Sequence, residues 1–258
     1  MILHHATWPE VEAYLKNSRG VVIPTGSTEQ HGPTGLIGTD SITAETVALA
    51  MADITGALVG PTLSLSQAQF NLGFPGTVSL RPSTLIQVII DYVQSLARHG
   101  FEHFYFLNGH GGNISPAHCA FQELYADQSL GLHRGAAVQY RLRSWWDFSE
   151  VNEIRQRLYG VAEGMHATPS ELAITRHVLP AVSCVDNLPA PPLLSADFIR
   201  RHGGDNHEHA AAHRTQFPDG RVGSHSALGR PEHGAEIIAA AARAAARDYA
   251  AFLAGAEA

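Results

Sequence analysis

Apolar and polar positions along this chain follow two patterns: short apolar runs, and longer segments with helical spacing. The short runs are typical of buried strands and occupy residues 21–24, 58–61, 101–107 and 136–140. The longer segments place apolar residues on one face of a helix and occupy residues 39–54, 82–99, 114–125, 169–179 and 232–253. The order of the two patterns predicts strands that alternate with helices.

This alternation is typical of an α/β domain, in which helices cover both faces of a mostly parallel sheet. Ligands of such domains bind beyond the carboxyl ends of the strands. No internal repeat or low-complexity linker interrupts the chain, so we expect residues 1–258 to form a single domain. Residues 71–80 predict a loop that ends in a short strand. Residues 186–230, rich in Pro, Gly and His, predict a long loop region.

Composition narrows the classes of function. The net charge of −7 and the lack of a basic stretch argue against a nucleic-acid partner. The two cysteines, Cys119 and Cys184, stand in no paired motif, which excludes a disulfide framework, and Cys119 is expected to be a buried packing residue. The chain has no secretory start and no apolar stretch of membrane-spanning length. We therefore expect a cytoplasmic protein without a membrane partner.

Five residues with good metal-ligand side chains lie where strands pass into loops or where helices begin: Glu29, His31, Asp40, His110 and Glu171. Residues two apart in an extended segment point the same way, so Glu29 and His31 can face one cavity. Glycines on both sides of His110 leave room for a metal and a substrate beside its ring. Two imidazoles and three carboxylates suit two divalent cations that share one carboxylate, as in metal-dependent hydrolases.

Each motif has a simpler interpretation when it is taken alone. The run AsnGlyHisGlyGlyAsn at residues 108–113 also fits a tight turn or an anion-binding loop before a helix. The run GluGlnHis at residues 29–31 also fits a surface segment. Placement at strand ends and flanking glycines recur in both motifs, however, and this joint pattern favours a metal centre.

Three motifs, in this order, resemble those of the creatininase (creatinine amidohydrolase) family, and the resemblance extends over most of the chain. They are GlySerThrGluGlnHisGlyPro (26–33) with GlyThrAsp (38–40), AsnGlyHisGlyGlyAsn (108–113), and HisAla (166–167) followed by Glu171. The resemblance implies a three-layer α/β/α sandwich assembled into homo-oligomers, often hexamers. It also implies two divalent metal ions (Zn, Mn or Fe) and hydrolysis of an amide-type C–N bond in a small or cyclic substrate.

The resemblance implies ligand sets in which two metals share Asp40: Glu29, Asp40 and His110 for one metal, and His31 and Asp40 for the other. Creatininase proper completes the second set with a glutamate at the position of Gly112. In family branches with GlyGly at that place, a later glutamate can replace it. In this chain that residue is Glu171, and Glu163 is the next candidate.

His166 resembles the catalytic histidine of the family. We expect a metal-bridging water, ionised to hydroxide, to attack the amide carbonyl, and His166 to pass a proton to the leaving nitrogen. Met165 replaces an acid of creatininase proper, and GlySerHisSerAlaLeuGly (223–229) replaces a Gly-Asp-Pro segment. With Gly112, these departures argue against creatinine as the substrate. Formamides, small cyclic amides and peptide trimming stay open.

We expect an aromatic pair and one histidine to contact the substrate. Trp145 and Trp146 are adjacent, so one is expected in the core and the other in the wall of the pocket. His225 lies close to a family motif and is a further candidate. The histidines of residues 202–213 fit either a solvated loop or a loop that reaches the substrate pocket.

Two other classes of function stay open. One is a metal-stabilised α/β protein that binds a small ligand or partner without turnover. The other is a lactonase or an isomerase on the same scaffold. Metals whose coordination positions are all filled by protein would favour the first class, whereas a bound water and an intact His166 favour hydrolysis.

Overall fold

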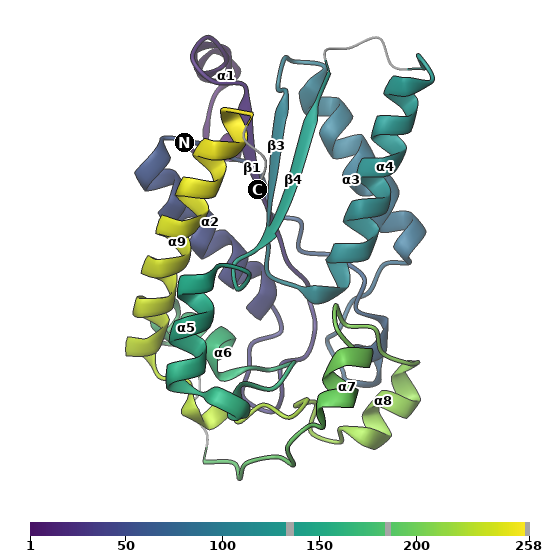
Figure 1. Cartoon of the computed structure of the whole chain (residues 1–258), viewed down its shortest axis with the longest axis vertical. Coiled ribbons are helices and arrows are strands. Elements are labelled where there is room, and N and C mark those ends of the chain that lie inside the picture. Colours follow the sequence, from purple (N-terminus) through teal and green to yellow (C-terminus); the bar gives the residue numbers. More distant parts are fainter. Residues whose placement is uncertain (133–136, 184–186, 256–258) are drawn as a thin grey trace.

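The computed structural model describes residues 1–132, 137–183 and 187–255. Its described strands are β1 (Gly20–Thr25), β2 (Leu58–Val59), β3 (His103–Asn108) and β4 (Gln139–Ser144), and they form one parallel sheet in the order β2-β1-β3-β4. Figure 1 labels β1, β3 and β4 side by side. Thr25 at the end of β1 pairs with Asn108 of β3, which in turn pairs with Ser144 of β4. The carboxyl ends of these three strands therefore meet at one edge.

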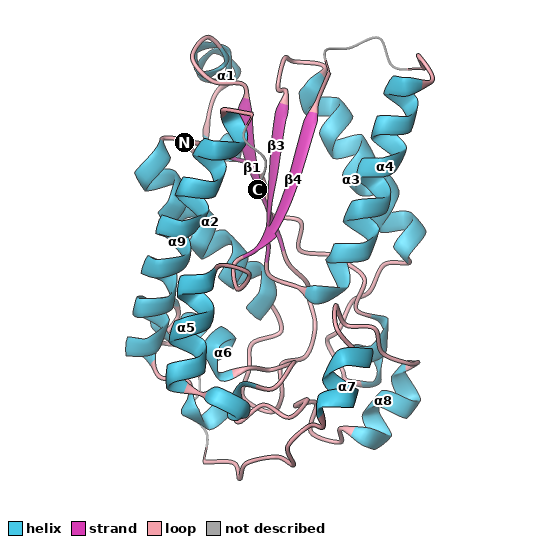
Figure 2. Cartoon of the chain, in the orientation of Figure 1, coloured by secondary structure: helices cyan, strands magenta, loops and turns pink. Residues whose placement is uncertain are grey.

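Helices cover both faces of the sheet (Figure 2). The α-helices are α1 (Trp8–Leu15), α2 (Thr39–Thr55), α3 (Pro82–Ala97), α4 (Ile114–Ser129), α5 (Ser149–Leu158), α6 (Pro169–Val178), α7 (Ala196–Arg201), α8 (Ala210–Gln216) and α9 (Pro231–Leu253). Short 3-10 helices are η1 (Leu3–His5), η2 (Gln69–Gly73), η3 (Gly111–Asn113), η4 (Gly160–Glu163) and η5 (Ser226–Leu228). None of the described helices is both long and apolar enough to cross a bilayer.

Successive residues of β1 supply two separate hydrophobic cores, because side chains alternate across a strand. Val22 packs with residues of α2 and α9 on one face. Val21 and Ile23 pack with residues of α3 and α4 on the other face. Helices α5 and α6 pack in turn against α9 (Figure 1). The expected three-layer α/β/α sandwich with a parallel sheet is confirmed.

Two glycines allow α2 to begin directly against the carboxyl edge of the sheet. A Cβ atom on Gly26, just after β1, would lie 2.3 Å from the backbone nitrogen of Ser41. A Cβ atom on Gly109, just after β3, would lie 2.3 Å from the carbonyl oxygen of Asp40. Backbone atoms of a helix cannot move aside singly. The first turn of α2 is therefore held between the ends of the two central strands.

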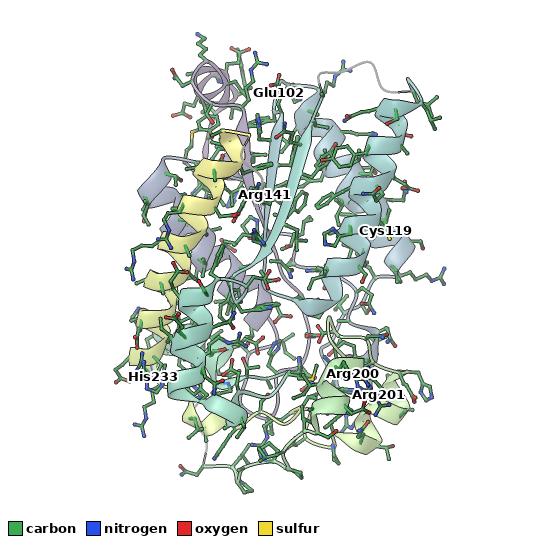
Figure 3. All side chains as sticks on the ribbon, in the orientation of Figure 1. Glu102, Cys119, Arg141, Arg200, Arg201 and His233 are labelled. Atoms are coloured by element: carbon green, nitrogen blue, oxygen red, sulfur yellow. The ribbon has the colours of Figure 1, made fainter. Side chains whose placement is uncertain are left out.

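The last predicted strand lies later in the chain than the apolar pattern indicated. Strand β4 covers Gln139–Ser144 and not residues 136–140, of which residue 136 lies outside the described part. It is an edge strand whose Arg141 and Arg143 side chains contact Asp248 of α9. Because these arginines are polar, the pattern of apolar runs does not predict a strand at residues 141–144. Figure 3 labels Arg141 on this strand.

Other expectations for loops and packing held only in part or were wrong. Residues 71–80 contain the end of η2 and isolated bridges at Val78 and Ser79, but no named strand. The expected loop at residues 186–230, of which residue 186 lies outside the described part, contains α7, α8 and η5. Helices α1 and α5 were not predicted at all, although a capping box joins Thr7 to Glu10 at the start of α1. Cys119 is exposed on α4 (Figure 3) and is not a buried packing residue.

We expect Gly26→Ala to lower the free energy of unfolding by about 1–3 kcal/mol, because the added methyl group would push the end of β1 away from α2. Urea unfolding followed by circular dichroism measures this change. Gly203→Ala is the control, since its added Cβ would come no closer than 3.9 Å to a neighbouring atom, the carbonyl oxygen of Ile199. Equal stability of the two variants would contradict the close packing at Gly26.

Candidate metal centre

The structure brings all five expected ligands together at the carboxyl edge of the sheet. They come from the loop after β1, the first turn of α2, the loop after β3 and the first turn of α6. Every one of them is buried, and the exposed fractions are 0% for Glu29, 1% for His31, 2% for Asp40, 2% for His110 and 8% for Glu171. Charged groups are buried in this way only when partners compensate them.

Asp40 belongs to two groups of side chains, each close enough to hold one metal ion: Glu29, Asp40 and His110, and His31, Asp40 and Glu171. Its Oδ2 atom lies 3.1 Å from Nδ1 of His110, whereas its Oδ1 atom lies 2.8 Å from Nε2 of His31. Oε1 of Glu29 lies 3.2 Å from the same Nδ1 atom of His110. Asp40 thus presents one oxygen to each group, which is the arrangement of a bridging carboxylate.

The far nitrogen of each imidazole lies against a backbone carbonyl. Nε2 of His110 is 2.8 Å from the carbonyl oxygen of Gln67, and Nδ1 of His31 is 3.1 Å from that of Glu29. A carbonyl oxygen only accepts hydrogen bonds, so each of these nitrogens carries a proton. In a neutral ring, the nitrogen that faces the carboxylates then has a free lone pair. Metal-ligating histidines are oriented in this way.

The buried carboxylates of the cluster favour positive charge beside them. Burial alone would raise the pKa of Asp40, but His31 and His110 hold this pKa well below its usual range. Burial alone would lower the pKa of His31, but Asp40 and other carboxylates raise it to about 10, and the pKa of His110 is likewise raised well above its usual value. Protons on the imidazoles or bound cations can meet this demand.

Three buried atoms of the cluster make no hydrogen bond of acceptable geometry, although each lies within ion-pair distance of a neighbour: Glu29 Oε1, His31 Nε2 and Asp40 Oδ2. A buried polar atom without a hydrogen bond costs roughly 1–3 kcal/mol. The three atoms belong to the two groups that share Asp40, and nitrogen and carboxylate oxygen are suitable donors for Zn, Mn or Fe. The residues therefore fit divalent cations.

Glu171 is held in place by the start of α6. Its Oε2 atom accepts hydrogen bonds from the backbone N–H and the hydroxyl of Thr168, both at 2.8 Å, in a capping box. Burial raises the pKa of this carboxyl to about 7. Glu163, the alternative ligand, instead accepts hydrogen bonds from Arg155 and Ser170. Within the described residues, Glu163 belongs to none of the possible metal-holding groups.

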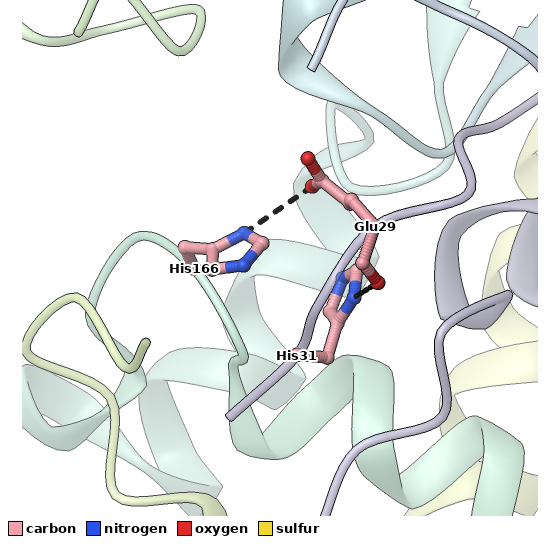
Figure 4. Close-up of side chains that lie close together, drawn as sticks. All are labelled: Glu29, His31 and His166. Atoms are coloured by element: carbon pink, nitrogen blue, oxygen red, sulfur yellow. Dashed lines mark hydrogen bonds and ion pairs between the residues drawn. The ribbon is translucent and has the colours of Figure 1, made fainter. Parts of the chain in front are cut away.

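His166 borders the same cluster and is buried. Its Nδ1 atom lies 3.5 Å from Oε1 of Glu29 (Figure 4), and its Nε2 atom lies 2.7 Å from the carbonyl oxygen of Gln30. Burial lowers the pKa of His166 to about 4, so the ring is neutral near pH 7. Because Nε2 carries the proton, the lone pair on Nδ1 faces the cluster. Glu29, His31 and His166 also form a third possible metal-holding group.

A cavity of about 180 Å³ is lined by four of the five candidate ligands: Glu29, Asp40, His110 and Glu171. Trp145 and Trp146 both line it, with their rings 5.5 Å apart and at 87° to each other. Trp145 also packs in the core and is 1% exposed, whereas Trp146 is half-buried. His225 does not line this cavity and lies in a separate depression beside Asn187. The structure therefore brings the two tryptophans to the candidate site but does not bring His225 there.

The sequence reasoning missed two charged residues that line the cavity, Arg155 and Asp205. Arg155 lies on α5, with its guanidinium group 5.9 Å from the centre of the Trp145 ring. Asp205 lies in the loop between α7 and α8, and burial raises the pKa of its carboxyl to about 6. Neither residue belongs to a motif. A polar residue beside a Gly pair is the only signal for Asp205.

Three of the histidines around Asp205 pack together, whereas His209 is exposed. The rings of His202 and His207 are 5.0 Å apart, and those of His207 and His213 are 4.9 Å apart. His213 is 3% exposed, and burial lowers its pKa to about 4. Gly204 and Asp205 are the members of this segment that line the cavity. The segment therefore reaches the candidate site through Asp205.

The sequence of this chain matches known proteins. A model of the creatininase family, described as creatinine amidohydrolase, matches residues 4–248. Creatinine amidohydrolase of Pseudomonas putida is 34% identical over 163 residues, which cover 59% of this chain and 60% of that enzyme. A mycofactocin precursor peptide peptidase of Mycobacterium ulcerans is 29% identical over 212 residues, which cover 77% of this chain and 71% of the peptidase.

The fold also matches solved structures. A creatininase structure described as the Mn form is 25% identical and superposes with a TM-score of 0.73 over 96% of each chain. The family model spans most of this chain, and the described residues contain groups that can hold metal ions. The chain belongs to the creatininase (creatinine amidohydrolase) family.

Proposed function

We propose that this protein is a metal-dependent amidohydrolase in which two divalent cations share Asp40. The observation that carries the proposal is the geometry of Asp40, which directs one oxygen to His110 and the other to His31. The first cation would be held by Glu29, Asp40 and His110, and the second by His31, Asp40 and Glu171. Such cations supply an electrophile for a carbonyl oxygen and a water that is ionised near neutral pH.

His166 is proposed to carry the proton in this reaction. The carbonyl oxygen of Gln30 holds its Nε2–H, so Nδ1 is left to accept a proton on the side of the cluster. A neutral ring near pH 7 can take up this proton and then donate it to the leaving nitrogen. The alternative role of His166 is metal ligation together with Glu29 and His31.

The size and walls of the cavity support a small amide as the substrate. A cavity of about 180 Å³ exceeds only modestly the roughly 150 Å³ that holds a benzene molecule in an engineered protein core. Trp145 and Trp146 in the wall of the cavity offer apolar surface for a ring or a short chain. We infer a formamide-type or small cyclic amide substrate. Gly112 and Met165 replace acids expected in creatininase proper and argue against creatinine itself.

We also propose an oligomeric state and a cellular location for the enzyme. The family resemblance favours a homo-oligomer, often a hexamer in this family, built from single-domain subunits in the cytoplasm. A screen of the metal-loaded protein against formamides, cyclic amides and lactones tests the reaction class. Turnover of an amide that stops after chelation supports the proposal. Turnover of lactones alone would favour a lactonase, and binding of small ligands without any turnover would favour the non-catalytic alternative.

Asp40→Ala should lose both metal ions together, because Asp40 is proposed to hold both. Metal content, measured by mass spectrometry after purification with added Zn²⁺ or Mn²⁺, gives the result directly. Asp53→Ala is the control, since Asp53 is an exposed carboxylate on the same helix α2. Two metal ions per chain in the Asp40 variant would rule out the bridging assignment.

Glu171→Gln should retain about one metal ion per chain. Glutamine can keep the capping box with Thr168, so α6 should begin as before while the second cation loses a charged ligand. The group of Glu29, Asp40 and His110 should stay occupied. Competition with a coloured chelator measures the two affinities separately. Loss of both ions, or of neither, would contradict the assigned role of Glu171.

His166→Ala should keep both metal ions and the fold but lower kcat on the order of 10²–10⁴-fold, as expected for a group that transfers the proton. Metal content, melting temperature and kcat are measured on the same preparation. Loss of one metal ion would favour the ligand role with Glu29 and His31. An unchanged kcat in a folded, metal-loaded variant would exclude the proton-transfer role.

A further inference from the structure

The loop between α7 and α8 carries a further carboxylate to the candidate metal centre. The Asp205 side chain is 11% exposed, and its Oδ2 atom lies 3.6 Å from Nδ1 of His110. The same nitrogen lies 3.2 Å from Oε1 of Glu29 and 3.1 Å from Oδ2 of Asp40. Three carboxylates therefore lie near the imidazole nitrogen that is proposed to bind the first cation, and Asp205 lies just outside the group of Glu29, Asp40 and His110.

The backbone around Asp205 is arranged to hold its carboxylate there. Oδ2 accepts a hydrogen bond of 2.9 Å from the backbone N–H of Gly112. A Cβ atom on Gly111 would lie 2.4 Å from the same Oδ2 atom, so a glycine is required for this approach. Asp205 itself has a left-handed backbone with φ 55°, a conformation that non-glycine residues adopt at a cost and that is often found at functional sites.

Two independent observations point to a cation at this place. Oε1 of Glu29 and Oδ2 of Asp40 are buried and lack a hydrogen bond, and both are aimed at the position that Asp205 borders. Charge balance gives the second argument. Glu29, Asp40 and Glu171 bring three negative charges against the four positive charges of two divalent cations. While the metal-bound water is neutral, a fourth carboxylate would complete the balance inside a buried cluster.

We propose that Asp205 is a ligand of the cation held by Glu29, Asp40 and His110. This inference rests on the proposed function, since it assumes that a cation binds there. It gives the segment that contains α7 and α8 a role in the metal centre, although that segment lies far along the chain from the other ligands. In Figure 1 both helices lie beside the loops at the carboxyl edge of the sheet.

Asp205→Asn tests the inference, because asparagine keeps an oxygen for the Gly112 N–H and tolerates the left-handed backbone but removes the charge. The probe is Mn²⁺ titrated into the chelator-treated full chain and followed by calorimetry. We expect two equivalents in the parent protein, and in Asp205→Asn an affinity lower by about tenfold or more at one site only. Glu208→Gln, an exposed carboxylate of the same loop, should leave both affinities unchanged.

A double variant, in which Asp205→Asn is combined with Glu171→Gln, identifies the affected site. In Glu171→Gln, the remaining ion should occupy the group of Glu29, Asp40 and His110, so adding Asp205→Asn should weaken that ion. If Asp205→Asn does not fold, as judged by circular dichroism, Asp205→Gly provides the same loss of charge with a permitted backbone. Unchanged affinities together with a lower kcat would overturn the ligand role and favour contact with substrate. A parent protein that binds no Mn²⁺ or Zn²⁺ would instead overturn the proposed function.

Discussion

The arrangement of this molecule depends on one buried carboxylate, that of Asp40, which lies between two imidazoles at the first turn of α2. Burying a charge is costly unless partners compensate it. The surrounding chain must therefore place the compensating side chains accurately around the Asp40 carboxylate. Gly26 and Gly109 allow α2 to begin against the ends of β1 and β3. The loops that leave these two strands carry the other groups of the first proposed site. The sheet therefore fixes the centre of the cluster.

The ligands differ in how firmly the fold holds them. Asp40 and Glu171 lie in the first turns of helices, where the helix dipole favours a negative charge and where a capping box fixes Glu171. Backbone carbonyls orient both imidazoles. In contrast, the walls of the cavity come from the segment after β4 and from the α7–α8 loop. We infer that the first set, together with Asp205 of the α7–α8 loop, determines the metal chemistry and that the remaining wall residues adapt the cavity to a substrate.

Much of this arrangement could be predicted from the sequence because it follows from local patterns. Apolar runs and helical spacing identified the central strands and most of the long helices, and ligand side chains next to glycines at strand ends identified the cluster. Asp205 could not be found in this way, since its approach to His110 depends on the tertiary path of the α7–α8 loop. Strand β4 was misplaced because its arginines find their partner on α9, far along the chain.

Two metal ions are proposed to share Asp40. Anomalous diffraction from crystals of the protein grown with Zn²⁺ or Mn²⁺ tests this proposal most directly, because each ion gives its own peak. We expect two peaks, one on each side of the Asp40 carboxylate: the first beside His110 and the second beside His31. A single peak, or two peaks of which one lies away from Asp40, would contradict the proposal.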